Sequence, residues 1–151
     1  MRLIVLTQAV NLDDPYMGFF HRWVERLAAR SEEVRVAANG IGRHNMPANV
    51  RVYSLGKERG ASRILKSLRL ALFLVRNLSS CDGVFVHMCP EYVRILHPIN
   101  LFFRKPVAMW YAHVQVSAGA AWAVAHVDYV LSPSIESFAL PTGKLVTTGH
   151  G

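Results

Sequence analysis

Side chains that can hydrogen-bond or carry charge follow several short apolar runs of this sequence. His87 closes the run GVFVH and Glu91 lies four residues later, and His113 comes just after the run PVAMWY. An imidazole can donate or accept a hydrogen bond and changes charge near neutral pH, and a carboxylate accepts hydrogen bonds from hydroxyl groups. Such residues at the ends of apolar runs indicate a site for a polar ligand.

The loop after the first apolar run carries two carboxylates and then a glycine. Asp13 and Asp14 are adjacent and do not form an Asp-x-Asp pair, and the two cysteines, Cys81 and Cys89, are too few for a disulfide scaffold. We therefore expect free thiols and no metal site. Gly18 opens the next helical pattern. Either its lack of a Cβ lets a ligand approach the helix N-terminus, or the glycine is an ordinary helix cap.

The sequence ends in the run KLVTTGHG, in which a short β-prone segment precedes a glycine-bracketed histidine. Gly149, His150 and Gly151 form the bracket. Glycines on both sides of one residue are typical of a turn. We expect this turn to lead from the last strand toward a further segment.

Short apolar runs alternate with helical patterns along nearly the whole chain. The predicted strands lie at 2–7, 34–38, 50–53, 83–87, 106–111, 129–131 and 145–148. The predicted helices lie at 18–30, 63–78, 92–103 and 117–126, with one helical turn at 135–139. Uniformly apolar runs are typical of strands buried on both faces, and apolar residues three and four apart are typical of helices packed on one side.

This alternation defines the predicted fold class and the place of the site. Strands that alternate with helices form right-handed βαβ units, so we predict an α/β, Rossmann-like, doubly wound and mainly parallel sheet with helices on both faces. In such sheets ligands bind beyond the carboxyl ends of the strands. The polar residues named above follow predicted strands and are expected to meet at that edge.

Length and charge narrow the possible functions. The 151 residues, of which 52% are hydrophobic, suit one packed domain, and 17 Lys and Arg against 10 Asp and Glu give a formal net charge of +7. A positive charge favours anionic partners. No recognisable nucleic-acid module interleaves basic and aromatic residues, so we expect no nucleic-acid partner. The apolar start is too short for a signal peptide, and we expect a cytoplasmic protein.

Three short motifs in a fixed order carry a resemblance to a known family. They are WYAH (Trp110 to His113), ESF (Glu136 to Phe138) and GHG (Gly149 to Gly151). Together with the opening run RLIVLTQAV they resemble the N-terminal half of a family 4 type glycosyltransferase of the GT-B fold. Relatives have Trp-Tyr-Thr-His, Ser-x-Glu-Ser-Phe and Gly-His-Gly-Ile-Asp at these places. The resemblance extends over essentially the whole chain.

The resemblance implies an enzyme of two Rossmann-like domains with the reaction in the cleft between them. Residues 1–151 correspond to the acceptor-side domain, and the donor-binding C-terminal domain is absent from them. The implied activity is hexosyl transfer, with retention of anomeric configuration, from a nucleotide-sugar co-substrate to a glycan or lipid-linked acceptor of polysaccharide biosynthesis. No other cofactor is implied. The fragment alone is expected to be inactive.

The resemblance also implies roles for individual residues. His113 would lie beside the transferred sugar as the catalytic histidine, with a hydrogen bond to a loop backbone as its structural alternative. The implied acceptor contacts are Asp13, Asp14, His87 and Glu91, and the implied donor-side residues are Gly18, Gly149, His150 and Gly151. Glu91 has a structural alternative, because it follows Pro90 at a predicted helix start, where a negative charge is favourable.

A basic stretch between residues 59 and 80 raises a separate hypothesis. Its cations are Arg59, Arg63, Lys66, Arg69 and Arg76. Helical spacing predicts that they lie opposite a buried apolar row, which comprises Leu65, Leu68, Leu72 and Val75. Such a basic stripe either contacts anionic lipid, as a peripheral protein at the inner face of a membrane would, or is a solvated helix face.

Other classes of protein remain possible at this point. The chain can be a non-catalytic subunit that binds acceptor and membrane and pairs with a separate donor-binding chain. A flavodoxin-like or receiver domain is disfavoured, because Asp13 and Asp14 lie well past the first strand and the third predicted strand ends near Tyr53 without an aspartate.

Overall fold

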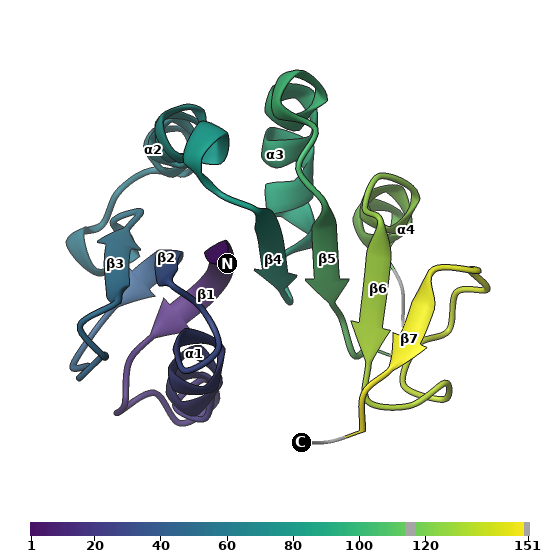
Figure 1. Ribbon diagram of the computed structural model, residues 1–151, viewed down its shortest axis with the longest axis horizontal. Coiled ribbons are helices and arrows are strands. Elements are labelled where there is room, and N and C mark those ends of the chain that lie inside the picture. The colour runs from purple at the N-terminus through teal and green to yellow at the C-terminus, as the bar shows by residue number, and fades with distance from the viewer. Residues whose placement is uncertain (114–116, 150–151) are drawn as a thin grey trace.

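The computed structural model describes residues 1–113 and 117–149, which form one sheet of seven strands and four α-helices (Figure 1). The strands are β1 (Arg2–Val10), β2 (Glu33–Ile41), β3 (Val50–Ser54), β4 (Gly83–His87), β5 (Val107–Trp110), β6 (Tyr129–Ser132) and β7 (Leu145–Thr147). The helices are α1 (Phe20–Ala28), α2 (Arg63–Asn77), α3 (Pro90–Phe103) and α4 (Ala118–Ala125). Two 3₁₀ turns, η1 (Lys57–Arg59) and η2 (Leu78–Ser80), flank α2.

The strand order is β3-β2-β1-β4-β5-β6-β7, and every neighbouring pair in the described residues is parallel. The chain first moves outward from β1 to β2 and β3, then returns to β4 on the other side of β1 and moves outward again to β7. This is the doubly wound parallel α/β sheet that the alternation of patterns predicted. All five residues of β4 are buried, as expected for a strand covered on both faces.

Helices cover the two faces of the sheet unequally. Figure 1 shows α2, α3 and α4 above the sheet and α1 below it. One buried cluster joins the three upper helices to the sheet, and a second joins α1 to β1, β2 and β4. No helix of the described residues therefore covers the lower face of the sheet at β5 and β6.

One predicted element is wrong. The predicted helical turn at 135–139 is a non-helical turn, in which Phe138 forms an isolated parallel bridge with His113. Ser134 still acts much as a helix cap would, because its Oγ accepts a hydrogen bond from the Ser137 backbone N–H at 3.3 Å. The cap-type hydrogen bond is therefore present, but the segment does not continue into a helix.

The predicted faces of α2 are also wrong. The row that was expected to be buried is exposed, and comprises Leu65, Leu68, Leu72 and Val75. The helix instead buries Leu70, Phe73 and Leu74 against the sheet. The segment RILKSLRLALFLVRN carries large apolar residues on both sides of the helix, so periodicity alone does not decide which side faces inward.

Two polar contacts accompany this orientation of α2. Ser62 caps the helix through a hydrogen bond from the Leu65 backbone N–H to its Oγ at 3.3 Å. The guanidinium of Arg69 donates to the Leu55 carbonyl at 2.9 Å and is half-buried there. Arg69 therefore ties the helix to the loop that follows β3.

Two consecutive residues of β5 lie on opposite faces of the sheet and test how each face is covered. We expect Met109→Ala to destabilise the chain by about 2 to 5 kcal/mol, because Met109 is fully buried under the upper helices. Ala108→Ser, one residue earlier on the half-covered lower face, is expected to cost no more than about 0.5 kcal/mol. Urea unfolding measures both, and similar losses in the two variants would contradict the arrangement of the layers.

Candidate functional site

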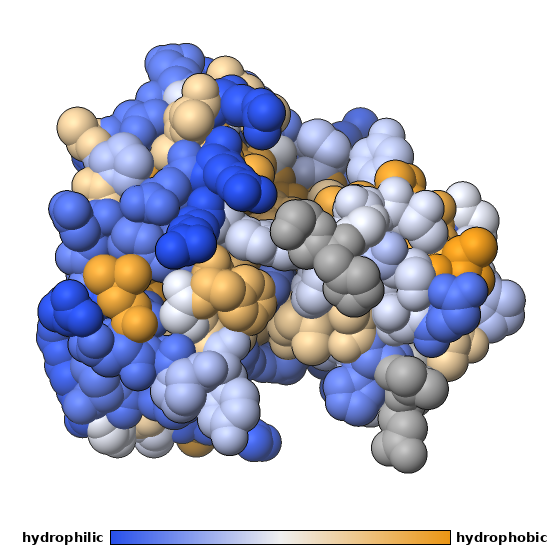
Figure 2. Space-filling view, turned by 90° about the horizontal axis from the view of Figure 1, so that it is seen from below, coloured by the Kyte–Doolittle hydropathy of each residue, from blue (hydrophilic) through white to orange (hydrophobic). Residues whose placement is uncertain are grey.

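The site lies where the direction of the chain switches within the sheet. β1 pairs with β2 on one side and with β4 on the other. The connections that follow β1 and β4 leave in opposite directions along the sheet. In such sheets a crevice forms at the carboxyl ends of these two strands. Figure 2 views the molecule from below and shows hydrophilic surface on its left, paler and more apolar surface on its right, and a hollow between the two at the lower edge.

A chain of polar side chains crosses this switch point. Gln8, near the end of β1, donates from Nε2 to Oε1 of Glu91 at 2.7 Å. Asn39, near the end of β2, donates from Nδ2 to Oε1 of Gln8 at 3.0 Å. The amide of Gln8 thus links the second strand to the first turn of α3, and the three residues are exposed or half-buried. Solvent-accessible amide and carboxylate groups held in this way can bind the hydroxyl groups of a ligand.

Glu91 is held at the crevice by a sharp connection between β4 and α3. Met88 has a φ of 54°, a left-handed conformation that is uncommon for a residue other than glycine, and its backbone N–H donates to the Trp110 carbonyl at 2.9 Å. The helix begins at Pro90, with Glu91 in its first turn. A carboxylate is favourable there because the first backbone N–H groups of a helix lack partners within it.

The two aspartates of the first loop have partners of their own. Asp13 pairs with Arg43, and the hydrogen-bonded guanidinium holds the pKa of that carboxyl below its ordinary value. Oδ1 of Asp14 accepts the backbone N–H groups of Tyr16 and Met17 at 2.9 and 2.8 Å. Both carboxylates therefore shape the loop, and no contact in the described residues joins either of them to Glu91.

Gly18 is packed against its own loop. A Cβ at this position would lie 2.8 Å from the Asp14 carbonyl oxygen and 3.1 Å from that of Leu12. The backbone N–H of Gly18 also donates to the Asp14 carbonyl at 2.9 Å. The predicted open approach for a ligand at Gly18 is therefore wrong, because the space beside its Cα is filled by the loop. Glycine is needed here to close the loop tightly.

The predicted acceptor contact of His87 is also wrong, since the side chain is fully buried. Its ring is stacked between Phe20 of α1, at a centroid distance of 4.0 Å, and Trp110 of β5, at 5.2 Å. Nδ1 lies 3.4 Å from Oγ1 of Thr7. Burial disfavours the charged imidazole and lowers the pKa of His87 from its ordinary value to about 4.

This aromatic cluster fixes α1 beneath the crevice. Trp23 of α1 meets the rings of His87 and Trp110 edge-on, at 5.5 and 5.3 Å. Aromatic contacts of this geometry add stabilisation beyond the area they bury. Because α1 follows the first loop directly, the cluster also sets where that loop lies.

The motifs that carried the family resemblance lie close together. His113 is exposed, and its bridge with Phe138 joins the WYAH segment to the ESF segment. The ring of His113 lies 6.3 Å from that of Tyr111. Gly149 has a φ of 71°, and its N–H donates to the Pro133 carbonyl at 3.1 Å. His150 and Gly151, predicted to face the donor, lie outside the described residues.

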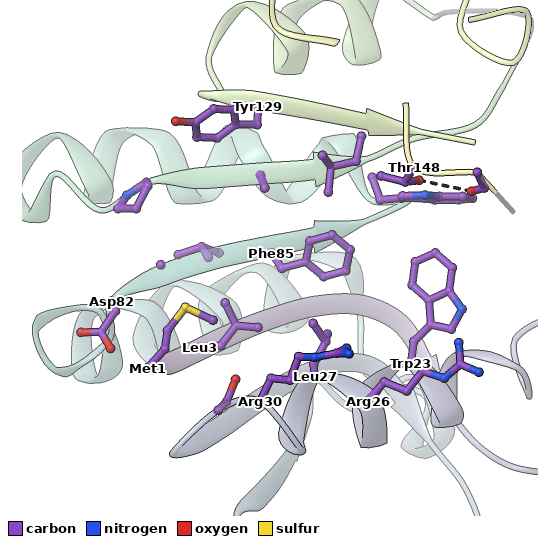
Figure 3. Close-up of a pocket in the computed structure, with 18 residues that line it drawn as sticks. Met1, Leu3, Trp23, Arg26, Leu27, Arg30, Asp82, Phe85, Tyr129 and Thr148 are labelled. Carbon is purple, nitrogen blue, oxygen red and sulfur yellow. Dashed lines mark hydrogen bonds between the residues drawn. The ribbon is translucent and has the colours of Figure 1, made fainter. Parts of the chain in front are cut away.

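A separate apolar groove lies on the lower face of the sheet (Figure 3). It has a volume of about 550 Å³ and runs between α1 and strands β4 to β6. Leu3, Leu27 and Phe85 form much of its wall, and Arg26 and Arg30 lie along its α1 side. The residues of the polar chain do not line it. The groove is the uncovered part of the sheet.

Two kinds of feature are absent from the described residues. Within residues 1–113 and 117–149, no group of three or more His, Cys, Asp or Glu residues is arranged to hold a metal ion. Among the helices of the same residues, none combines the length and the apolar character needed to span a bilayer.

Comparisons with solved structures identify the class of fold. Anabaena HepE, solved with UDP, matches all of this chain at 13% identity and a TM-score of 0.66, over 44% of its own length. MurG of Acinetobacter baumannii matches 98% of this chain at 12% identity and a TM-score of 0.63, over 46% of its length. The lipopolysaccharide outer core galactosyltransferase WaaB, solved without ligand, matches 90% at 12% identity and a TM-score of 0.58, over 40% of its length.

These likenesses show the fold. The neighbours are GT-B glycosyltransferases, together with UDP-GlcNAc 2-epimerases, and this chain has the fold of one Rossmann-like half of such proteins. The chain spans less than half the length of these structures. No protein-family model matches the sequence, and no curated protein matches it.

Sequence reasoning missed two members of the polar chain. Gln8 and Asn39 are single amides that directly follow the predicted strands 2–7 and 34–38. They are 31 residues apart, and Gln8 is 83 residues from Glu91. Their position near the carboxyl ends of predicted neighbouring strands was the available signal. Glu91 was predicted as an acceptor contact; the structure joins it to Gln8, and its contact with an acceptor stays a prediction.

We expect Gly18→Ala to destabilise the chain by about 1 to 3 kcal/mol, because the new methyl group would collide with two carbonyl oxygens of the first loop. Gly143→Ala is the matched control, since nothing lies within 4 Å of the added Cβ, and is expected to change stability by less than about 0.5 kcal/mol. Thermal unfolding measures both. Equal melting temperatures for the two variants would contradict the packing at Gly18.

The buried imidazole of His87 predicts a pH-dependent stability. The unfolded chain takes up a proton near pH 6.5, whereas folded His87 does so only near pH 4, so its contribution is complete above pH 6.5 and falls with pH. Between pH 6.5 and 5 the expected loss is up to about 2 kcal/mol.

His87→Phe should remove this slope, whereas His44→Gln, at an exposed histidine, should retain it. Urea unfolding at a series of pH values provides the measurement. A slope that persists unchanged in His87→Phe would mean that another group is responsible.

Proposed function

We propose that this chain is the acceptor-side half of a glycosyltransferase that transfers a sugar from a nucleotide-sugar donor to a glycan or lipid-linked acceptor. The observation that carries the proposal is the polar chain of Asn39, Gln8 and Glu91 at the switch point of a GT-B-like half. Ligands of open α/β sheets bind at such points, and these side chains suit hydroxyl groups.

The chemistry assigned to each residue follows from its position. Glu91 accepts hydrogen bonds from acceptor hydroxyls, and Gln8 positions its carboxylate by donating to one oxygen. His113, exposed after β5, hydrogen-bonds the transferred sugar and offsets charge that develops at the anomeric centre. Gly149, His150 and Gly151 are assigned to the donor side, as the family resemblance implies. Asp13 and Asp14 contribute through the shape of the first loop.

The donor is assigned to a second half that residues 1–151 do not include. The structures matched here are more than twice as long as the part that this chain matches. On this proposal the first half has no activity alone, transfer retains anomeric configuration, and a nucleotide sugar is the only co-substrate. The site of action is the cytoplasmic side of a membrane when the acceptor is lipid-linked. Turnover of a nucleotide sugar by residues 1–151 alone would contradict this division.

Two alternatives keep the same fold. A non-catalytic subunit would bind the acceptor and pair with a separate donor-binding chain. A nucleotide-sugar epimerase is the other, because UDP-GlcNAc 2-epimerases are among the structural neighbours. An epimerase needs no acceptor, so binding of an acceptor glycan distinguishes it from the transferase.

The test measures acceptor binding by isothermal titration calorimetry with free oligosaccharides and short-chain isoprenyl-diphosphate sugars. We expect Glu91→Gln to weaken binding about tenfold or more, because a hydrogen bond to a charged group is replaced by a weaker one. Glu136→Gln, at an exposed glutamate after β6, is the matched control and should bind as the parent does. Equal affinity of the parent and Glu91→Gln for every ligand that binds would contradict the assignment.

A further inference from the structure

Phe19 is an exposed aromatic residue at the start of α1. Its side chain is 49% exposed, whereas that of the next residue, Phe20, is fully buried. Ser, Thr, Asn and Asp are the usual residues just before a helix, because their side chains accept hydrogen bonds from its first N–H groups. Phe19 holds this position and makes no such bond. Neither full burial nor helix capping therefore accounts for a large ring here, and residues that break a local rule in this way concentrate at functional sites.

The ring of Phe19 is held over the end of β4. It meets the ring of His87, the last residue of β4, at a centroid distance of 6.1 Å and the ring of Trp23 at 6.0 Å, both in edge-to-face geometry. The carbonyl of Phe19 accepts a hydrogen bond from the Arg22 backbone N–H at 3.1 Å, and the closely packed Gly18 precedes it. Both the ring and the backbone are thus positioned by the folded chain.

Phe19 and the polar chain belong to opposite walls of the crevice. Thr7 and His87 lie near each other on the lower face of the sheet, against α1. Successive side chains of a strand point to opposite faces, so Gln8 points to the upper face, where it donates to Glu91 in the first turn of α3. Figure 1 shows α1 and α3 on opposite faces of the sheet. The crevice between their first turns has polar groups on one wall and an aromatic ring on the other.

Tyr16 is a weaker candidate for the aromatic wall. Its side chain is 84% exposed in the loop before α1. Within residues 1–113 and 117–149 its ring makes no contact with another ring. Nothing comparable to the contacts of Phe19 therefore positions the ring of Tyr16 over the crevice.

A pyranose ring has a surface that fits two unlike walls. Its hydroxyl groups surround the ring, and its C–H groups gather on the ring faces, so one sugar can hydrogen-bond at its edge and pack a face on an aromatic side chain. The face of an aromatic ring carries partial negative charge, which attracts the weakly positive C–H hydrogens. Ligand sites commonly combine aromatic walls with a few convergent polar groups. An open-chain polyol has the same polar groups without the apolar face.

We propose that Phe19 is the stacking wall of the candidate site, on which the C–H face of a neutral pyranose packs while its hydroxyl groups reach Gln8 and Glu91. The inference rests on the proposed function, because it specifies the part of the acceptor that occupies the crevice. That part is a sugar ring of the glucose or galactose type, with at least one face free of bulky substituents.

The experiment is nuclear magnetic resonance of methyl β-glucopyranoside and methyl β-galactopyranoside in the presence of the chain, with sorbitol as the open-chain control. Protons that pack on an aromatic face shift upfield, because the ring current opposes the applied field there. We expect upfield shifts confined to the protons on one face of the bound pyranose. Sorbitol, which has hydroxyl groups but no ring, should show no such shifts.

Two substitutions separate stacking from a structural role of the side chain. Phe19→Leu keeps an apolar side chain and removes the aromatic face, so it should abolish the upfield shifts and weaken binding by roughly fivefold. Phe19→Tyr keeps the ring and should retain both the shifts and the affinity. Phe102→Leu is the matched control, because Phe102 is 85% exposed at the opposite end of α3 from Glu91, and it should behave as the parent does.

The inference fails if the bound pyranosides show no upfield shifts with the parent, or if Phe19→Leu leaves the shifts and the affinity unchanged. In either case a loss of binding in Glu91→Gln would still support the proposed acceptor site, without a stacking wall. Absence of binding by both pyranosides also overturns the inference, because a single sugar ring would then not be what the crevice recognises.

Discussion

The position of β1 between β2 and β4 is the constraint on which the rest of the structure depends. Because both neighbours are parallel to β1, the carboxyl ends of all three strands lie at one edge, and the connections that leave them diverge. Gln8, Asn39 and Glu91 come from distant parts of the sequence and meet only because of this pairing. The proposed binding of acceptor hydroxyls rests on that meeting.

The buried core supports the same edge from below. His87 ends β4 between the rings of Phe20 and Trp110, and therefore holds α1 and β5 together directly under the crevice. A histidine in this role must stay neutral, so a residue whose type suggests ligand chemistry works here as a packing element. Gly18 contributes in a similar way, by allowing the first loop to close on itself.

Sequence patterns predicted the strands well because most are uniformly apolar, and β4 was predicted with its observed bounds. They predicted the faces of α2 poorly, because leucines occur on both sides of that helix and the side that is buried is the one that packs on the sheet. Burial of His87 depends on rings brought in by other elements. The sequence pattern can thus place a polar residue at the carboxyl edge of the sheet. Which residues it contacts and whether it is buried depend on the order of the strands.

The central claim is that the crevice at the switch point binds an acceptor. The most direct measurement is nuclear magnetic resonance of the isotope-labelled chain during titration with an oligosaccharide or isoprenyl-diphosphate sugar that it binds. The account predicts that the largest amide shift changes occur at Gln8, Asn39 and Glu91 and in the segment around Met88. Shift changes confined to the apolar groove around Trp23 and Leu27, with the polar chain unaffected, would contradict it.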